Sequence, residues 1–116
     1  MKHWKDLLVW QKSHELVLSV YRITSDFPKS ERYGIVDQTR RAAASIPANT
    51  VEGHSRNSQK DFLRFLYIAR GSLEELRYFL LLSRDLDFIN KDKYLELEEN
   101  CQQVSKLLNG LIKSLS

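Results

Sequence analysis

The 116-residue sequence is poor in the residues that interrupt regular structure, with only 4 glycines and 2 prolines. This scarcity disfavours β-sandwiches and β-barrels, because those folds need many turns. No apolar run approaches the roughly 18 consecutive residues that a membrane-spanning helix requires. The length corresponds to a single domain, residues 1–116.

Cysteine is almost absent too, which bears on the cellular compartment in which we expect the protein. Cys101 is the only one, so it has no partner for a disulfide within the chain. The stretch at residues 1–6, MKHWKD, has neither the apolar segment nor the cleavage site of a secretion signal. Both observations predict a protein of the reducing cytoplasm.

Motifs for metal binding and catalysis are missing as well. The histidines are scattered, and Glu52 and His54 lack the Glu-x-x-His spacing of di-iron bundles. There is no Gly-x-Ser-x-Gly elbow and no phosphate-binding loop. Cys101 lies on a helical apolar seam, where we expect it to pack in the core. The sequence therefore predicts no metal site, no cofactor and no enzymatic activity.

What the sequence does contain is helical spacing of apolar residues in four long segments. The predicted helices span residues 7–27, 31–55, 58–87 and 91–115, and the last has the most regular heptad repeat. Short connections between long helices make consecutive helices antiparallel. We therefore expect an all-α fold, an antiparallel up-down-up-down four-helix bundle.

Several residues that favour helix ends stand at these boundaries. The expected N-caps are Asp6, Ser30, Ser58 and Asn90. Ser58 also starts a capping box with Asp61. Pro47 lies inside the second segment, where proline removes a backbone donor and clashes with the carbonyl of Ala43. We predict one helix that is kinked at Pro47 and not divided in two.

A polar stripe at helical spacing runs through this proline-containing segment. Its members are Ser45, Asn49, Glu52 and Arg56. We favour a structural seam of Ser45, Asn49 and Glu52 that satisfies the groups freed by Pro47 and sets the helix register. A contact surface for a partner is the alternative.

Two glycines lie inside predicted helices, where each costs about 1 kcal/mol relative to alanine. Gly71 is expected to let a neighbouring helix approach closely, with a ligand role as the alternative. Gly53 is grouped with Pro47 and Gly71 as a site of bending and close packing.

Positive charge is the one chemical signal on the expected surface. The net charge is +3, and the first half of the chain carries the whole excess. Guanidinium and ammonium groups around the turn between the second and third helices suit phosphate oxygens, although a merely solvated surface would also explain them. The candidates for nucleic-acid contact are Arg40, Arg41, Arg56, Lys60, Arg64 and Arg70.

Several stretches of the sequence, taken together, resemble those of one protein family. They are Trp10-Gln11-Lys12, Phe27-Pro28, Gln38 to Gly53 with its Ser-Ile-Pro-Ala-Asn segment, and residues 69–76, ARGSLEEL. Together they resemble the bacterial four-helix-bundle family of 23S rRNA intervening-sequence proteins, and the similarity covers nearly the whole chain. A related branch comprises accessory proteins of diversity-generating retroelements, which bind nucleic acid and a reverse transcriptase.

This resemblance implies a bundle that assembles into a barrel-like cyclic pentamer, and it favours nucleic-acid binding. Surplus apolar residues of the first and third helices then become candidates for the subunit interface. These candidates are Trp10, Val17, Tyr21, Leu63, Tyr67 and Leu81.

The functional expectation is a non-enzymatic homo-oligomer that binds RNA or DNA through its basic residues. The alternative is a protein-interaction module that docks a reverse transcriptase or a ribosomal factor without touching nucleic acid. A hydrolytic enzyme without a recognised motif is a third hypothesis.

Overall fold

The computed structural model describes residues 3–116, and its regular structure is entirely helical. The long helices are α1 (Leu8–Thr24), α2 (Asp37–Ser55), α3 (Gln59–Asp85) and α4 (Lys91–Leu115). Short 3-10 turns occupy Trp4–Asp6 and Lys29–Glu31, and a π-helical turn at Arg32–Val36 leads into α2. Because the described residues contain no strand, the predicted all-α four-helix fold is confirmed.

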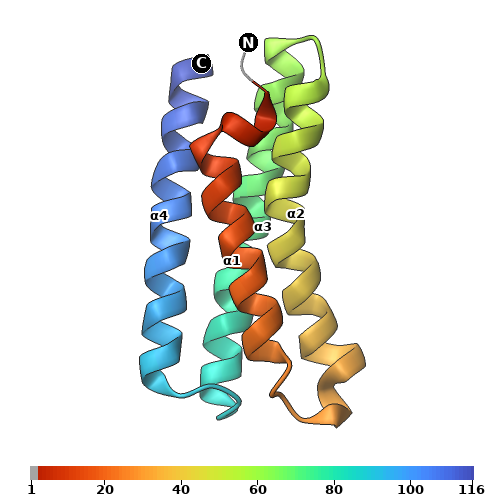
Figure 1. The fold of residues 1–116 in the computed structure, drawn as a ribbon, viewed down its shortest axis with the longest axis vertical. Coiled ribbons are helices and arrows are strands. Elements are labelled where there is room, and N and C mark those ends of the chain that lie inside the picture. Colours follow the sequence, from red (N-terminus) through yellow and green to blue (C-terminus); the bar gives the residue numbers. More distant parts are fainter. Residues whose placement is uncertain (1–2) are drawn as a thin grey trace.

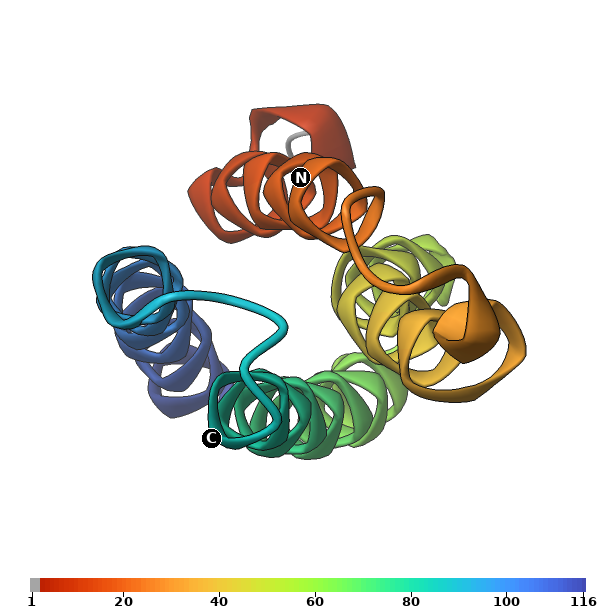
Figure 2. The ribbon, with the colours of Figure 1, turned by 90° about the horizontal axis from the view of Figure 1, so that it is seen from below.

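The four helices lie side by side around a common axis, in the order α1, α2, α3, α4 (Figure 2). Along the colour gradient of Figure 1 the chain runs down α1, up α2, down α3 and up α4. The contact between α2 and α3 is the most extensive, whereas α1 and α4 close the ring with fewer contacts. The turn between α2 and α3 therefore lies at the end of the bundle where α1 begins and α4 ends (Figure 1).

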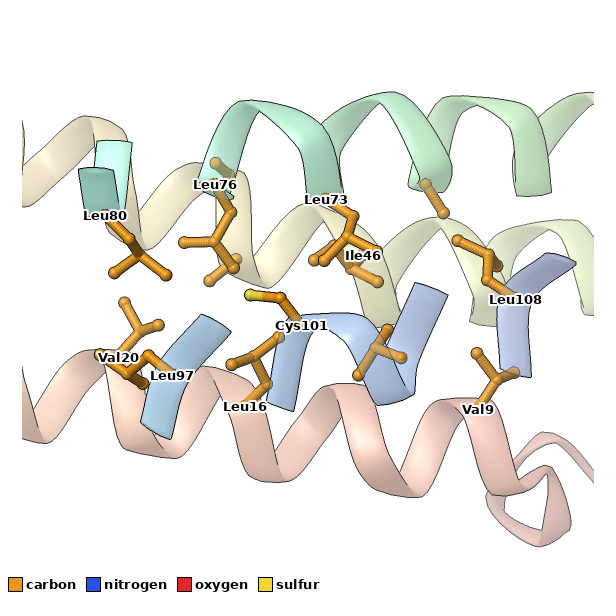
Figure 3. Close-up of a cluster of buried hydrophobic side chains, with 14 of the residues drawn as sticks. Val9, Leu16, Val20, Ile46, Leu73, Leu76, Leu80, Leu97, Cys101 and Leu108 are labelled. Carbon is orange, nitrogen blue, oxygen red and sulfur yellow. The ribbon is translucent and has the colours of Figure 1, made fainter. Parts of the chain in front are cut away.

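The hydrophobic core runs along the bundle axis, where side chains of all four helices meet (Figure 3). Its fully buried members include Leu16 from α1, Ile46 from α2, Leu73, Leu76 and Leu80 from α3, and Cys101 and Leu108 from α4. Cys101 has no exposed surface, so its predicted core position is confirmed. Within residues 3–116, no helix combines the length and apolar composition needed to cross a membrane.

The caps of α3 and α4 are formed as predicted. The Ser58 hydroxyl accepts a hydrogen bond from the Asp61 N–H at 3.2 Å. The Asn90 side-chain oxygen accepts one from the Lys93 N–H at 2.8 Å. At its far end α3 stops two residues before the predicted boundary, because Asp87 adopts a left-handed conformation with φ of 63°.

The ends of the first two helices differ from the prediction. Asp6 does not cap α1, because it lies in a 3-10 turn and the capping position is Leu7. Helix α1 stops at Thr24, where the Thr24 and Ser25 hydroxyls each donate to a carbonyl one turn earlier at 2.7 Å. Phe27 follows outside the helix and packs against Phe88, with ring centroids 5.4 Å apart.

The second helix begins later than the predicted residue 31. Ser30 lies in a 3-10 turn and caps nothing, and regular α-helix begins only at Asp37. The physical reason is Gly34, whose φ of −107° and ψ of −112° are not helical. Beyond that point α2 continues through Pro47 as one helix, as predicted. The bend at Pro47 stays a prediction.

Candidate nucleic-acid interface

The six basic residues proposed for nucleic-acid contact do not form one cluster. Arg40 and Arg41 lie in the first turns of α2, whereas Arg56 directly follows its last residue. At 1.5 Å of rise per residue, about 24 Å of helix separates Arg40 from Arg56. The expectation that all six surround the α2–α3 turn is therefore wrong for Arg40 and Arg41.

Arg40 instead ties the start of α2 to the end of α1. Its Nε donates to the Thr24 hydroxyl at 2.9 Å, and its Nη2 donates to the Tyr21 carbonyl at 3.2 Å. The guanidinium carbon lies 4.5 Å from the centre of the Tyr21 ring. A cation at this position also stabilises the negative end of the α1 dipole. The contacts of Arg40 thus hold two helices together.

Arg41, unlike Arg40, does not link α2 to another helix in the part of the chain that the structure describes. Its side chain is 77% exposed and pairs with Asp37 of the same helix at 3.0 Å. Such an exposed pair contributes little to stability. Arg41 is therefore an exposed charge, paired only within its own helix among the described residues, at the end of the bundle remote from the α2–α3 turn.

At the α2–α3 turn itself, two arginines share one aromatic ring. The guanidinium carbons of Arg56 and Arg64 lie 5.1 and 4.5 Å from the centre of the Phe65 ring. Glu52 accepts from Arg56 at 3.1 Å, and Asp61 lies 4.0 Å from Arg64. Each guanidinium carries five N–H donors, more than these partners use. The pair is thus held in place by Phe65 and still presents donors to solvent.

Gly53 makes this arrangement sterically feasible. A Cβ atom at position 53 would lie 2.7 Å from the Phe65 Cβ and 3.0 Å from the Phe62 Cδ1, so close packing requires glycine here. Gly71 behaves differently, because a Cβ there would meet nothing within 4 Å. The expectation that Gly71 allows close helix approach is therefore wrong within this chain, since the residue lies on the exposed side of α3.

A shallow, mostly apolar groove lies beside the arginine pair on the outer side of α3. We refer to it as the α3 groove, and its lining residues are Lys60, Asp61, Leu63, Arg64, Tyr67 and Ile68. Tyr67 is 47% exposed and Ile68 is 43% exposed. Arg70 stands next to the groove, with its guanidinium carbon 4.8 Å from the centre of the Tyr67 ring and its Nη1 donating to Asn109 at 3.2 Å.

This groove combines residues that the sequence assigned to two separate roles. Lys60 and Arg64 were proposed to contact nucleic acid, whereas Leu63 and Tyr67 were proposed for a subunit interface. The structure places all four in one surface, so both partners cannot occupy it at once. Ile68 belongs to the same surface and was missed, although its spacing of four residues from Arg64 puts it on a neighbouring part of the helix.

The remaining interface candidates are partly covered within the chain. Trp10 stacks on His14, with ring centroids 5.1 Å apart, and meets Trp4 edge-on at 4.8 Å. Val17 is half-buried against the core. Tyr21, although 43% exposed, lies under Arg40. Leu81 is half-buried.

The polar stripe of α2 divides into two groups. The hydroxyl oxygens of Ser45 and Ser72 lie 2.8 Å apart, and the Asn49 amide donates to both the carbonyl and the hydroxyl of Ser45 at 2.8 Å. Glu52 lies outside this network and pairs with Arg56. The Asn49 amide bonds to Ser45, so it does not serve the Ala43 carbonyl freed by Pro47. Ser72 joins α3 to this network and was not part of the predicted seam.

Two observations bear on metal binding and on the reactivity of Cys101. Within residues 3–116, no three histidine, cysteine or acidic side chains gather to hold a metal ion. Burial raises the pKa of the Cys101 thiol to about 12, so it is a poor nucleophile near neutral pH. The exposed basic and aromatic residues around the α2–α3 turn form the candidate surface considered below.

Comparison with known proteins gives the chain a family. No curated protein matches the sequence. Among solved structures, a protein of unknown function from the S23 ribosomal protein family of Bacteroides thetaiotaomicron has a similar fold, with a TM-score of 0.82. The two chains are 27% identical, and the match covers 91% of this chain and 99% of the other. The family model described as 23S rRNA-intervening sequence protein matches residues 5–110, and the chain therefore belongs to this family.

Proposed function

We propose that this protein binds nucleic acid, without catalysis, at the end of the bundle where α2 turns into α3. The observation that carries the proposal is the shared stacking of Arg56 and Arg64 on Phe65, which fixes two guanidinium groups beside the exposed Lys60. Guanidinium forks match the geometry of phosphate oxygens. The family name, which refers to an intervening sequence of 23S rRNA, supports RNA as the first candidate.

The acidic neighbours of this pair do not oppose the proposal. Glu52 and Asp61 are 54% and 46% exposed in their side chains, and exposed ion pairs of this kind are worth at most about 1 kcal/mol. A phosphate group can take their place on the guanidinium. The few phosphate contacts at this end should make the logarithm of the affinity fall linearly with the logarithm of the salt concentration.

The test is a matched set of charge-removing variants. Arg56→Gln with Arg64→Gln is compared with Arg41→Gln, an exposed arginine at the other end, by fluorescence anisotropy on labelled RNA over a range of salt concentrations. We expect the double variant to lose about tenfold or more in affinity and to reduce the salt slope by about 1 to 2. Arg41→Gln should bind like the wild type. Equal losses in both proteins, or binding that ignores salt, would contradict the proposal.

We further propose that the chain forms a homo-oligomer, with five subunits as the family resemblance implies. Exposed apolar side chains outside the α3 groove support self-association, among them Leu8 and Leu18 of α1 and Leu95 of α4. Light scattering after size exclusion measures the assembly directly. A mass of 13.6 kDa at every concentration, that of one chain, would rule the assembly out.

A protein-interaction module is the second candidate, favoured by the apolar lining of the α3 groove. In that case the double arginine variant would retain capture of the protein partner. A substitution such as Leu63→Glu, which places a charge in the groove, would abolish it.

A further inference from the structure

We propose that the α3 groove binds single-stranded nucleic acid in preference to duplex, and that a base stacks on Tyr67. This inference rests on the proposed function, since it names the kind of nucleic acid and the residue that distinguishes it. Its starting point is the position of an exposed aromatic ring in an apolar groove bordered by cations.

The apolar floor of the groove suits unpaired bases. Tyr67 and Ile68 are close to half exposed, and Leu63 continues the same surface. The faces of unpaired bases are free to cover such a surface, and stacking on an aromatic ring tolerates any base sequence. Bases in a duplex already cover each other's faces and present only their edges and the phosphate backbone. The groove therefore discriminates through stacking, which a duplex cannot supply.

Arg70 prepares the Tyr67 ring for this role. Its guanidinium lies on the ring, 4.8 Å from the centre, and its hydrogen bond to Asn109 of α4 anchors it there. With Arg70 over one face of the ring, a base would stack on the other face. A base stacked there extends an arginine–tyrosine stack and needs little rearrangement of side chains, because the ring is already held from behind.

Basic side chains lie along the groove at intervals that suit a nucleic-acid strand running parallel to α3. Lys60 and Arg64 are one helical turn apart, about 6 Å along the axis, and Arg70 follows beyond Tyr67. The backbone of a strand whose base stacks on Tyr67 would pass these side chains in succession. Within the groove only Asp61 carries negative charge, and Arg64 already lies 4.0 Å from it. The groove thus combines net positive charge with an aromatic platform.

The experiment compares three substitutions of Tyr67 with one matched control. Tyr67→Phe keeps the ring, Tyr67→Leu keeps the apolar volume without a ring, and Tyr67→Ala removes both. Tyr78→Ala removes an exposed tyrosine of the same helix outside the groove. The probes are a labelled 12-nucleotide single-stranded RNA without self-complementarity and the duplex formed with its complement. Circular dichroism and thermal unfolding confirm that each variant is folded.

We expect the wild type to bind the single strand about tenfold or more tightly than the duplex. Tyr67→Ala and Tyr67→Leu should lose about 5- to 100-fold in affinity for the single strand, the range found for removing one stacking contact, whereas Tyr67→Phe and Tyr78→Ala should lose little. The salt slope should stay the same in all Tyr67 variants, because no charge is removed.

The outcomes separate this inference from the function on which it rests. If neither probe binds at low salt, the proposed function fails and the inference fails with it. If the duplex binds as tightly as the single strand and binding still requires Arg56 and Arg64, only the inference is overturned. It is also overturned if Tyr67→Leu and Tyr78→Ala bind the single strand equally well.

Discussion

Gly53 and Phe65 bring α2 and α3 together next to the arginine pair, because a Cβ atom on Gly53 would lie 2.7 Å from the Cβ of Phe65. Gly71, also inside a helix, has free space where its Cβ would be. Two glycines that look alike in the sequence therefore have opposite consequences for stability.

We expect Gly53→Ala to destabilise the fold and Gly71→Ala to stabilise it. Overpacking at position 53 costs about 1–3 kcal/mol, offset by about 1 kcal/mol of better helix propensity, so a net loss of up to about 2 kcal/mol should result. At position 71 only the propensity gain remains. Urea unfolding followed by circular dichroism measures both. A stabilised Gly53→Ala would show that α2 and α3 do not cross closely here.

Arg77 and Glu98 link α3 to α4 through a partly buried ion pair. Arg77 Nε donates to Glu98 Oε1 at 3.1 Å, and the two side chains are only 28% and 18% exposed. This hydrogen bond raises the pKa of Arg77, so the guanidinium stays charged. Arg77→Gln, Glu98→Gln and the double variant form a thermodynamic cycle, from which we expect a coupling of about 1–2 kcal/mol. Additive losses would mean that the pair contributes nothing.

Cys101 should make stability depend on alkaline pH. Burial raises its pKa from 9.0 to about 12, so the folded state holds the thiol proton more tightly than the unfolded chain does. The resulting stability is fully present below pH 9 and is lost as the pH rises from 9 towards 12. The slope is about 1.4 kcal/mol per pH unit in that window.

Cys101→Ala isolates this effect from tyrosine and lysine titration. Urea unfolding at pH 8 and at pH 10.5 should show a smaller loss of stability in the variant than in the wild type. Identical losses in both proteins would mean that the thiol is ionised in the folded state.

Arg40 should prove to be a structural arginine. Arg40→Gln removes its stacking on Tyr21 and its bonds to the end of α1, and we expect a loss of about 1 kcal/mol in the free energy of unfolding. Its affinity for RNA and its salt slope should match those of Arg41→Gln. A loss of affinity as large as that of the Arg56 and Arg64 variant would assign Arg40 to the binding surface instead.

The parts of the structure that the sequence predicted correctly depend on short-range contacts. Ser58 and Asn90 cap helices through bonds to N–H groups three residues away, so local residue order decides them. Likewise, Arg56, Lys60 and Arg64 flank a turn of few residues and must end up near one another. The buried position of Cys101 was predictable from the heptad spacing of α4.

Some errors involve contacts between distant segments, and others involve local backbone conformation, as at Gly34, that apolar spacing does not reveal. Arg40 joins Tyr21 and Thr24 of another helix, and nothing near position 40 in the sequence reveals this. Phe27 lies beyond the end of α1 and packs against Phe88, which is far away in the chain. Helix propensity identifies the cost of a glycine, but only the packing of α2 on α3 decides which glycine is needed.

With four helices, α1 begins and α4 ends at the end of the bundle that carries the arginine pair (Figure 1). The Gln59 side chain, at the start of α3, donates to the carbonyl of Leu115 at the end of α4. Any domain or tag fused to either terminus would therefore be tethered beside the α2–α3 turn and could shield it. A probe inserted at the opposite end of the bundle, in the connection between α3 and α4, would not obstruct that surface.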